Sequence, residues 1–230
     1  MHPSDPRLNQ MRDALVGQVL TGSNRTQYFL RECIGEGGQG WVFRANYDDP
    51  SGLVVIVKVL RPDVVGGDAL RRFQREAEVL RMLSQQARPN PHVVRFFDHA
   101  VAQVPVGKEA IGLPFTVLEY VNGPTLEQVL RTAHGRGLAV ERVRRIIRQV
   151  VLALDAVHAQ KVVHRDLKPS NILVADNDGK PLPKIIDFGI AKATGPSLTD
   201  ETVITAVSEM VGTPAYLSPE QVTSAERGVD

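Results

Sequence analysis

Two aspartates, an asparagine and a lysine stand close together late in the chain, and their side chains suit phosphoryl transfer. Residues 164–171 read HRDLKPSN and residues 185–189 read IIDFG. One of the two carboxylates can hold an acceptor hydroxyl and take its proton, while the other, with the amide oxygen of Asn171, can hold magnesium against phosphates. A lone aspartate is more simply a turn or cap residue, but that interpretation does not explain the whole set. The residues therefore predict a phosphotransferase.

A glycine-rich segment early in the chain offers a second contact for phosphate. Residues 35–42 read GEGGQGWV, and glycines let backbone N–H groups approach phosphate oxygens. The pattern alone is weak, since a glycine-rich turn or a dinucleotide fingerprint looks similar. A dinucleotide site needs a helix directly after the glycines, whereas residues 41–44 (WVFR) are typical of a strand. The segment therefore favours a hairpin lid over ATP.

Lys58 interrupts the apolar run of residues 53–60. Alternation along a strand puts it on the same face as apolar residues two and four positions away, so its amine is expected among apolar groups and needs an anionic partner. Glu76, on a predicted helix over residues 68–83, is the expected partner, although a surface pair with Arg72 competes. A lysine that points to solvent from an edge strand is the simpler alternative.

These motifs together resemble the eukaryotic-like serine/threonine protein kinase family in its bacterial type. Residues 212–220, GTPAYLSPE, resemble the end of that family's activation segment, with Ser218 where the family has alanine. This block separates protein kinases from small-molecule kinases and favours Ser/Thr over Tyr acceptors. The resemblance covers residues 28–230 and implies an α+β, two-lobed fold. Its N-lobe is an antiparallel sheet with one main helix, and its C-lobe is mainly helical.

The resemblance assigns a role to each motif residue. Asp166 would be the catalytic base or hydroxyl-orienting group, Lys168 would point at the γ-phosphate, and Asn171 with Asp187 would bind Mg2+. Lys58, paired with Glu76, would orient the α- and β-phosphates. The implied ATP-binding set is Ile34, Gly35, Glu36, Gly37, Gly38, Gln39, Gly40, Val42, Ile56, Lys58, Glu119, Val121 and Leu173. The family has alanine two residues before the lysine, so the larger Ile56 predicts a narrower adenine slot.

The segment between residues 187–189 (DFG) and residues 212–220 (GTPAYLSPE) is expected to be a mobile loop. Residues 191–211 are polar and rich in Ser, Thr and Gly, as is usual for loops. A phosphate on Thr205 or Ser208 could bind Arg165 and order this segment, which predicts autophosphorylation there. The simpler alternative is that hydroxyl residues are common in loops.

Apolar patterning predicts the elements that carry these residues. Strands are expected at 28–34, 41–47 and 53–60, as in an antiparallel meander, and then at 93–97 and 114–121 on either side of a loop rich in Gly, Pro and Val. Helices are expected at 68–83 and 140–160, the second with one continuous apolar stripe. Short extended segments follow at 162–163, 172–174 and 184–186.

Composition fits a globular chain without pointing to nucleic acid. The 230 residues are 43% hydrophobic and carry a formal net charge of +1. The chain can therefore bury a hydrophobic core, and its net charge indicates no basic surface for nucleic acid. Cys33 is the single cysteine, which excludes an intramolecular disulfide and favours a reducing compartment. No apolar run reaches membrane-spanning length and the N-terminus does not resemble a signal peptide. A cytoplasmic protein is expected.

The expected organisation is a flexible extension at residues 1–27, an N-lobe at 28–121 and an incomplete C-lobe at 122–230. Kinases of this family continue into further helices after the segment matched by residues 212–220, so the domain is expected to be truncated. The favoured function is transfer of the γ-phosphoryl group of Mg-ATP to Ser/Thr hydroxyls of proteins. An inactive ATP-binding or scaffolding fragment is the main alternative, and a small-molecule kinase is a third.

Overall fold

The computed structural model describes residues 5–188, except 38–39, 66, 107–108 and 134–136, together with Tyr216. The chain folds as two compact units, residues 1–121 and 122–230.

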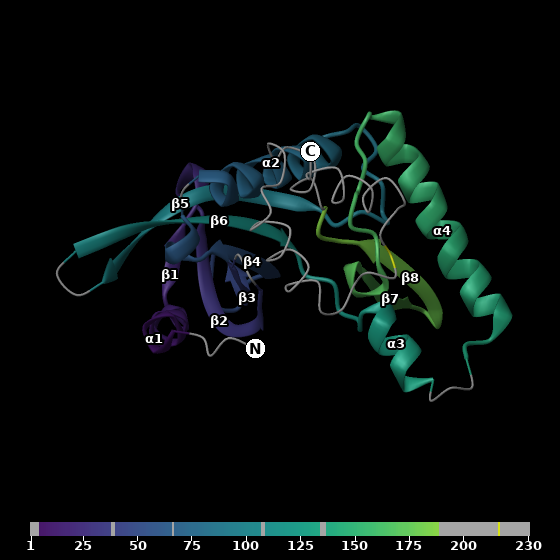
Figure 1. Cartoon of the computed structure of the whole chain (residues 1–230), viewed down its shortest axis with the longest axis horizontal. Helices are drawn as coiled ribbons and strands as arrows, with labels where there is room; N and C mark the ends of the chain where they lie inside the picture. The colour runs from purple at the N-terminus through teal and green to yellow at the C-terminus, as the bar shows by residue number, and fades with distance from the viewer. Residues whose placement is uncertain are drawn as a thin grey trace, which may run out of the picture. The chain divides into compact units, whose positions relative to one another are not determined.

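The first unit is a six-stranded antiparallel sheet with two α-helices (Figure 1). The strand order is β1 (Val19–Thr21), β2 (Gln27–Glu36), β3 (Gly40–Tyr47), β4 (Val54–Leu60), β6 (Glu109–Glu119) and β5 (Phe96–Val106). The helices are α1 (Pro6–Leu15) and α2 (Gly67–Ser84), with short 3-10 turns η1 (Ser23–Arg25) and η2 (Pro62–Val64). The predicted β2, β3, β4 and α2 are all present, and their observed ends lie within two residues of the expected ones.

One face of this sheet forms the apolar core of the unit. Val55, Val57 and Val59 of β4 are fully buried, as are Trp41 and Phe43 of β3. Residues directly opposite each other on paired strands share a face, so the alternation of β-branched and aromatic residues builds one continuous apolar layer. Burying such side chains contributes about 1.5–3 kcal/mol each. This layer fixes the register of the strands that carry the predicted ATP-binding residues.

The N-terminal segment differs from the prediction of a flexible extension. α1 begins after Asp5, whose carboxylate accepts a hydrogen bond from the Arg7 N–H, and β1 pairs with β2. Leu15 and Leu20 are only 1% exposed and belong to the core cluster of the sheet. The described part of residues 1–27 is therefore folded, because its apolar side chains cover the core face.

The loop predicted between residues 97 and 114 is instead a long hairpin of β5 and β6, which extends beyond the rest of the sheet in Figure 1. Ala102, Val104 and Leu113 pack into the core cluster, which stabilises the extended chain. Pro105 is tolerated because β5 is an edge strand. Pro114 lies just outside the stretch of β6 that pairs with β4.

The second unit packs helices against a two-stranded hairpin. Its elements are α3 (Leu126–Thr132), α4 (Val140–Ala159), the 3-10 turn η3 (Pro169–Asn171), β7 (Ile172–Asn177) and β8 (Lys180–Ile185). α4 contacts β8, and α3 contacts η3 and β7. Sequence analysis did not predict α3, whose Thr125 and Gln128 form a capping box at its start.

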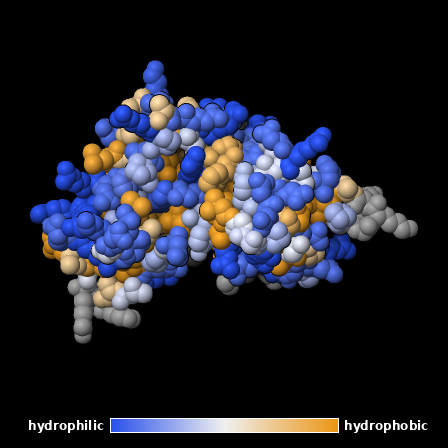
Figure 2. All heavy atoms as spheres, turned by 180° about the vertical axis from the view of Figure 1, so that it is seen from behind, coloured by the Kyte–Doolittle hydropathy of each residue, from blue (hydrophilic) through white to orange (hydrophobic). Residues whose placement is uncertain are grey.

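The apolar stripe predicted along α4 is only partly buried. Ile146, Val150 and Val157 are buried, but Ile147 and Val151 are 48% and 55% exposed. The buried side follows residues spaced by three and four, and the neighbouring apolar positions face outward. The face of the molecule in Figure 2 is mainly hydrophilic, with apolar side chains interspersed.

Candidate active site

The predicted contact between Lys58 and Glu76 is present in the first unit. Lys58 Nζ on β4 lies 3.0 Å from Glu76 Oε1 on α2, and the two side chains are 20% and 24% exposed. The carboxylate therefore compensates an amine that is largely removed from water. On the Lys58 face of β4, Leu60 is fully buried and Val54 is 36% exposed, so the apolar surroundings predicted for Lys58 are present in part. Ile56 is half-buried there, whereas the core residues point to the opposite face.

Sheet register brings several predicted ATP-binding residues onto this same face. Val42 lies opposite both Gly35 and Lys58, and Ile56 lies opposite Leu118. These pairs join β2, β3 and β4, which follow one another in sequence, and then β6, which lies beside β4 in the sheet. A continuous surface opposite the apolar core thus carries the glycine-rich segment, the lysine and the strand that leads to Glu119.

The glycine-rich segment is a hairpin, as predicted, with β3 starting at Gly40. The Gly37 N–H donates to the Gly40 carbonyl at 2.9 Å. A Cβ on Gly40 would lie 2.5 Å from the Val59 carbonyl oxygen, so close packing of backbones requires glycine there. Among the described residues, a Cβ on Gly35 would meet no atom closer than 3.6 Å, so contacts within this part of the chain do not explain that glycine. Gly38 and Gln39 lie outside the described residues.

The remaining predicted nucleotide contacts lie at strand ends or on β7. Glu119 ends β6, and its N–H donates to the Arg95 carbonyl at 2.8 Å while its carboxylate accepts from the Arg95 N–H at 3.1 Å. Val121 follows and is 8% exposed, whereas Ile34 on β2 is 50% exposed. Leu173 belongs to the second unit, where it pairs with Thr125.

The catalytic-loop residues predicted from the HRDLKPSN motif converge in the second unit. Lys168 Nζ lies 3.0 Å from Asp166 Oδ2. Asn171 is 5% exposed, and its Nδ2 donates both to the Asp166 carbonyl at 2.8 Å and to Asp166 Oδ2 at 3.1 Å. The 3-10 turn that delivers Asn171 starts with Pro169, whose fixed φ suits a first helical position. The Asp166 carboxylate is thus held by an ammonium group and an amide.

His164 links this loop to the segment that carries Asp187. The Asp166 N–H lies 3.3 Å from His164 Nδ1, and His164 Nε2 lies 2.9 Å from the Ile186 carbonyl oxygen. Because a backbone N–H only donates, Nδ1 must accept and the ring proton sits on Nε2. Burial lowers the pKa of His164, which favours this neutral form. The ring also packs on Phe188, with centroids 4.6 Å apart.

Sequence analysis assigned no separate role to His164, although the residue stood within the motif. Gly123 was also missed. A Cβ on Gly123 would lie 2.4 Å from the Val174 carbonyl oxygen, so glycine is required for the chain to pass β7. The signal for Gly123 was a glycine next to Pro124, which predicts a turn but not a close approach of backbones.

Asp187 and Arg165 both have positive φ, at 53° and 63°. This region is unfavourable for a long side chain such as arginine, and strained residues of this kind cluster at functional sites. Asn171 uses its amide N–H groups on Asp166, which leaves the amide oxygen as a possible metal ligand, and Asp187 adds a carboxylate. This donor set fits Mg2+, which usually binds one or two carboxylates together with substrate phosphates.

Several predicted features lie outside the described residues. They are Gly189, the loop at 191–211 with Thr205 and Ser208, and residues 212–220 apart from Tyr216.

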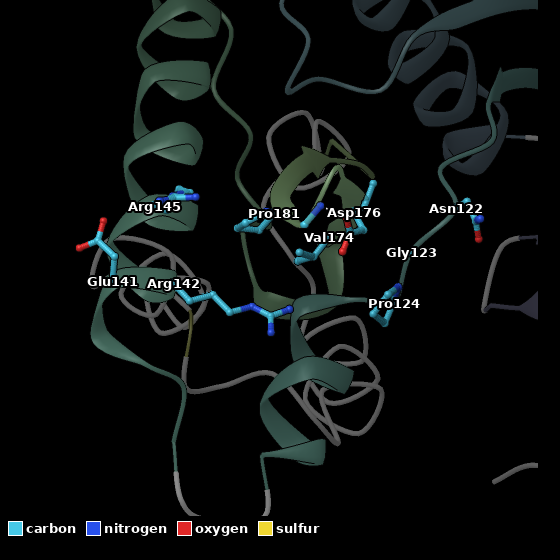
Figure 3. Close-up of a pocket in the computed structure, with 11 residues that line it drawn as sticks. Asn122, Gly123, Pro124, Glu141, Arg142, Arg145, Val174, Asp176 and Pro181 are labelled. Carbon is cyan, nitrogen blue, oxygen red and sulfur yellow. Dashed lines mark hydrogen bonds between the residues drawn. The ribbon is translucent and has the colours of Figure 1, made fainter.

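A separate hollow of about 550 Å3 opens on the second unit, lined by residues 122–124, the start of α4 and the β7–β8 hairpin. In Figure 3 the Arg142 side chain extends from α4 toward it. None of its described lining residues was predicted to bind ATP, metal or substrate. We assign it no part in phosphoryl transfer.

The family model described as protein kinase domain matches residues 28–230. The chain belongs to the protein kinase domain family. It is 38% identical over 216 residues to the serine/threonine-protein kinase pkn3 of Myxococcus xanthus, which covers 93% of this chain and 36% of that protein. It is 35% identical to serine/threonine-protein kinase A of Synechocystis, covering 87% of this chain and 37% of that protein. The chain thus spans little more than a third of the length of these curated relatives.

Solved structures of kinases agree with the observed fold. The PknI kinase domain of Mycobacterium tuberculosis matches with a TM-score of 0.57 and 28% identity, covering 80% of this chain and 65% of that chain. The predicted protein-kinase fold is therefore confirmed. Among the described residues, no helix is both long enough and apolar enough to cross a membrane.

Proposed function

We propose that this kinase-family chain transfers the γ-phosphoryl group of ATP to Ser or Thr hydroxyls of proteins. The observation that carries the proposal is the Asp166 carboxylate, held by both Lys168 and Asn171. A carboxylate fixed in this way can orient an acceptor hydroxyl and accept its proton, while the neighbouring lysine offers charge to a transferring phosphoryl group. Family membership and the names of the relatives support the same activity.

The nucleotide would be held mainly by residues of the glycine-rich hairpin and by the Lys58–Glu76 pair. The described residues leave space for a side chain at Gly35, so its glycine is not explained by contacts among them. Glycine at this position suits close approach of the backbone to a phosphate. Lys58 is aligned by Glu76 for contact with phosphate oxygens. Main-chain groups of Glu119 and Val121 would hold adenine, with Val42 and Ile56 as apolar contacts.

Asn171 and Asp187 would hold Mg2+, which neutralises charge on the phosphates when bound. The side chain of Asn171 is positioned by its two hydrogen bonds to Asp166. His164, kept neutral by burial, fixes the backbone on which both aspartates depend. Because ATP is a cytoplasmic nucleotide, we infer that the reaction takes place in the cytoplasm.

The test is phosphorylation of a generic Ser/Thr acceptor protein by the chain, with Mg-ATP, with ATP and chelator, and with the variants Asp166→Ala and Asp187→Asn. We expect transfer that depends on the metal and falls at least about 100-fold in Asp166→Ala. Mass spectrometry would show whether Thr205 or Ser208 is modified in the same reaction. Undiminished transfer by Asp166→Ala would refute the role of this carboxylate.

A further inference from the structure

Helix α1 lies outside the residues matched by the kinase family, yet one of its side chains contacts the glycine-rich segment. Arg12 Nη1 lies 2.7 Å from Glu36 Oε2, and the two side chains are 23% and 29% exposed. The same guanidinium is held by Asp13 Oδ1 at 2.8 Å. Arg61 also attracts Glu36, but its hydrogen bond goes to Asp63. Arg12 is therefore fixed between two carboxylates, one of them in the predicted ATP-binding segment.

The helix that carries Arg12 is firmly attached to the sheet. Leu15, one turn after Arg12, is 1% exposed in the core. The Gly17 N–H donates to the Leu30 carbonyl at 2.9 Å, and the Leu30 N–H donates to the Gln18 carbonyl at 2.9 Å. In Figure 1 α1 lies beside β2, the strand that ends at Glu36. The end of α1 and the middle of β2 are thus held together.

A second attachment follows directly after β1. Asp98 is 7% exposed, and its Oδ2 accepts from the Ser23 N–H at 3.0 Å and from the Tyr28 hydroxyl at 2.9 Å. Burial raises the pKa of Tyr28, so its hydroxyl remains a donor. A Cβ on Gly22 would lie 2.1 Å from Asp98 Oδ2, so only glycine fits at that turn. The N-terminal segment is therefore a rigid support, anchored on both sides of β1.

The support acts on one end of the glycine-rich hairpin. Glu36 is the last residue of β2 and precedes Gly37, which bonds to Gly40 across the hairpin. Gly40 is fixed by its close packing on Val59. We propose that Arg12 is a positioning residue that fixes the Glu36 end of this hairpin and thereby strengthens its hold on ATP. This inference rests on the proposed kinase function.

A double-mutant cycle on the full chain tests the coupling. Arg12→Gln, Glu36→Gln and the double variant are compared for KM of Mg-ATP and kcat, with Arg7→Gln as control, since exposed Arg7 lies on the same helix. We expect Arg12→Gln to raise KM about threefold to fivefold with little change in kcat, as for a partly exposed ion pair. Arg12→Lys should stay closer to the parent chain, and Arg12→Gln should add nothing in the Glu36→Gln background. In about 1 M salt the difference should shrink.

The outcomes separate this inference from the proposed function. A parent chain that transfers no phosphoryl group would overturn the proposed function itself. A parent chain that is active, with KM for ATP unchanged in Arg12→Gln, would overturn the role of Arg12 alone. If Arg12→Gln and Glu36→Gln each raise KM for ATP and their effects add fully in the double variant, Arg12 does not act through Glu36. Thermal melts confirm that each variant is folded before its kinetics are compared.

Discussion

Replacing Asn171 by aspartate separates two functions that this side chain can serve. As a metal ligand it needs only an oxygen, which aspartate keeps. As a support for Asp166 it needs its N–H groups, which donate to the Asp166 carbonyl at 2.8 Å and to the carboxylate at 3.1 Å. Aspartate has no such donor when ionised, and it places a second negative charge next to Asp166.

The magnitude follows from the bonds that are lost. A hydrogen bond to a charged group contributes about 1.5–3 kcal/mol and one to a neutral carbonyl about 0.5–1.5 kcal/mol. Since Asp166 is partly exposed, at 18%, we take the lower end, about 2–3 kcal/mol, which corresponds to a fall in kcat of about 30-fold to 150-fold. Steady-state kinetics at saturating Mg-ATP would measure it.

Ser170→Ala is the matched control, because Ser170 lies in the same 3-10 turn and its hydroxyl makes no hydrogen bond within the described part of the chain. Its kcat should stay within about twofold of the parent value. If Asn171→Asp keeps more than about a third of the parent kcat, the donor role is wrong and Asn171 acts only through its oxygen.

Three further predictions follow from other contacts. Lys58→Met should lower kcat/KM for ATP by at least about 30-fold, because the amine that Glu76 holds at 3.0 Å is lost; a kcat/KM within about threefold of the parent value, in a variant that a thermal melt shows to be folded, would contradict it. Burial lowers the pKa of His164 below its ordinary 6.5, although the nearby Asp166 and Asp187 oppose this shift, so the stabilising contribution of the neutral ring should be present above about pH 6.5 and be lost as pH falls below it. Urea unfolding at several pH values should show this loss weakened in His164→Gln, with His99→Gln measured beside it because burial also lowers the pKa of His99; an unchanged pH slope in His164→Gln would refute the assignment. Gly123→Ala should destabilise the second unit by about 1–3 kcal/mol, because its Cβ would lie 2.4 Å from the Val174 carbonyl oxygen. A urea denaturation midpoint equal to that of the parent chain would show that the backbone can shift without loss of stability, which would refute this prediction.

Local patterns predicted the elements whose sequence signal is strong. β3, β4, α2 and α4 were predicted close to their observed ends because alternating or helical apolar periodicity runs through each of them. α1 was missed although its signals are present. Asp5 caps the helix, Pro6 is at its first position and Gly17 takes a positive φ just after its end. The short apolar patch at residues 15–16 looked too small to fold, and its burial depends on a sheet face formed by distant strands.

The candidate site shows the same division between local and distant information. Motif spacing predicted that Asp166, Lys168 and Asn171 would act together, because they lie within six residues. The bond from His164 to the Ile186 carbonyl and the ion pair of Arg12 with Glu36 join segments more than twenty residues apart. No periodicity encodes such contacts, since they depend on how separate elements pack. The strands predicted at 93–97 and 114–121 overlap β5 and β6, but the segment between them was predicted as a loop, because Pro105 is compatible with a strand only at a sheet edge.

The central claim is that the chain moves the γ-phosphoryl group of ATP to a hydroxyl under the control of Asp166. The direct measurement incubates the chain with Mg-ATP labelled at either the γ- or the α-phosphate, together with matched peptides that differ only in having Ser or Ala at the acceptor position. We predict label on the Ser peptide from γ-labelled ATP alone, none on the Ala peptide, and loss of nearly all transfer in Asp166→Asn. Label from α-labelled ATP, or equal labelling by the parent chain and Asp166→Asn, would contradict the account.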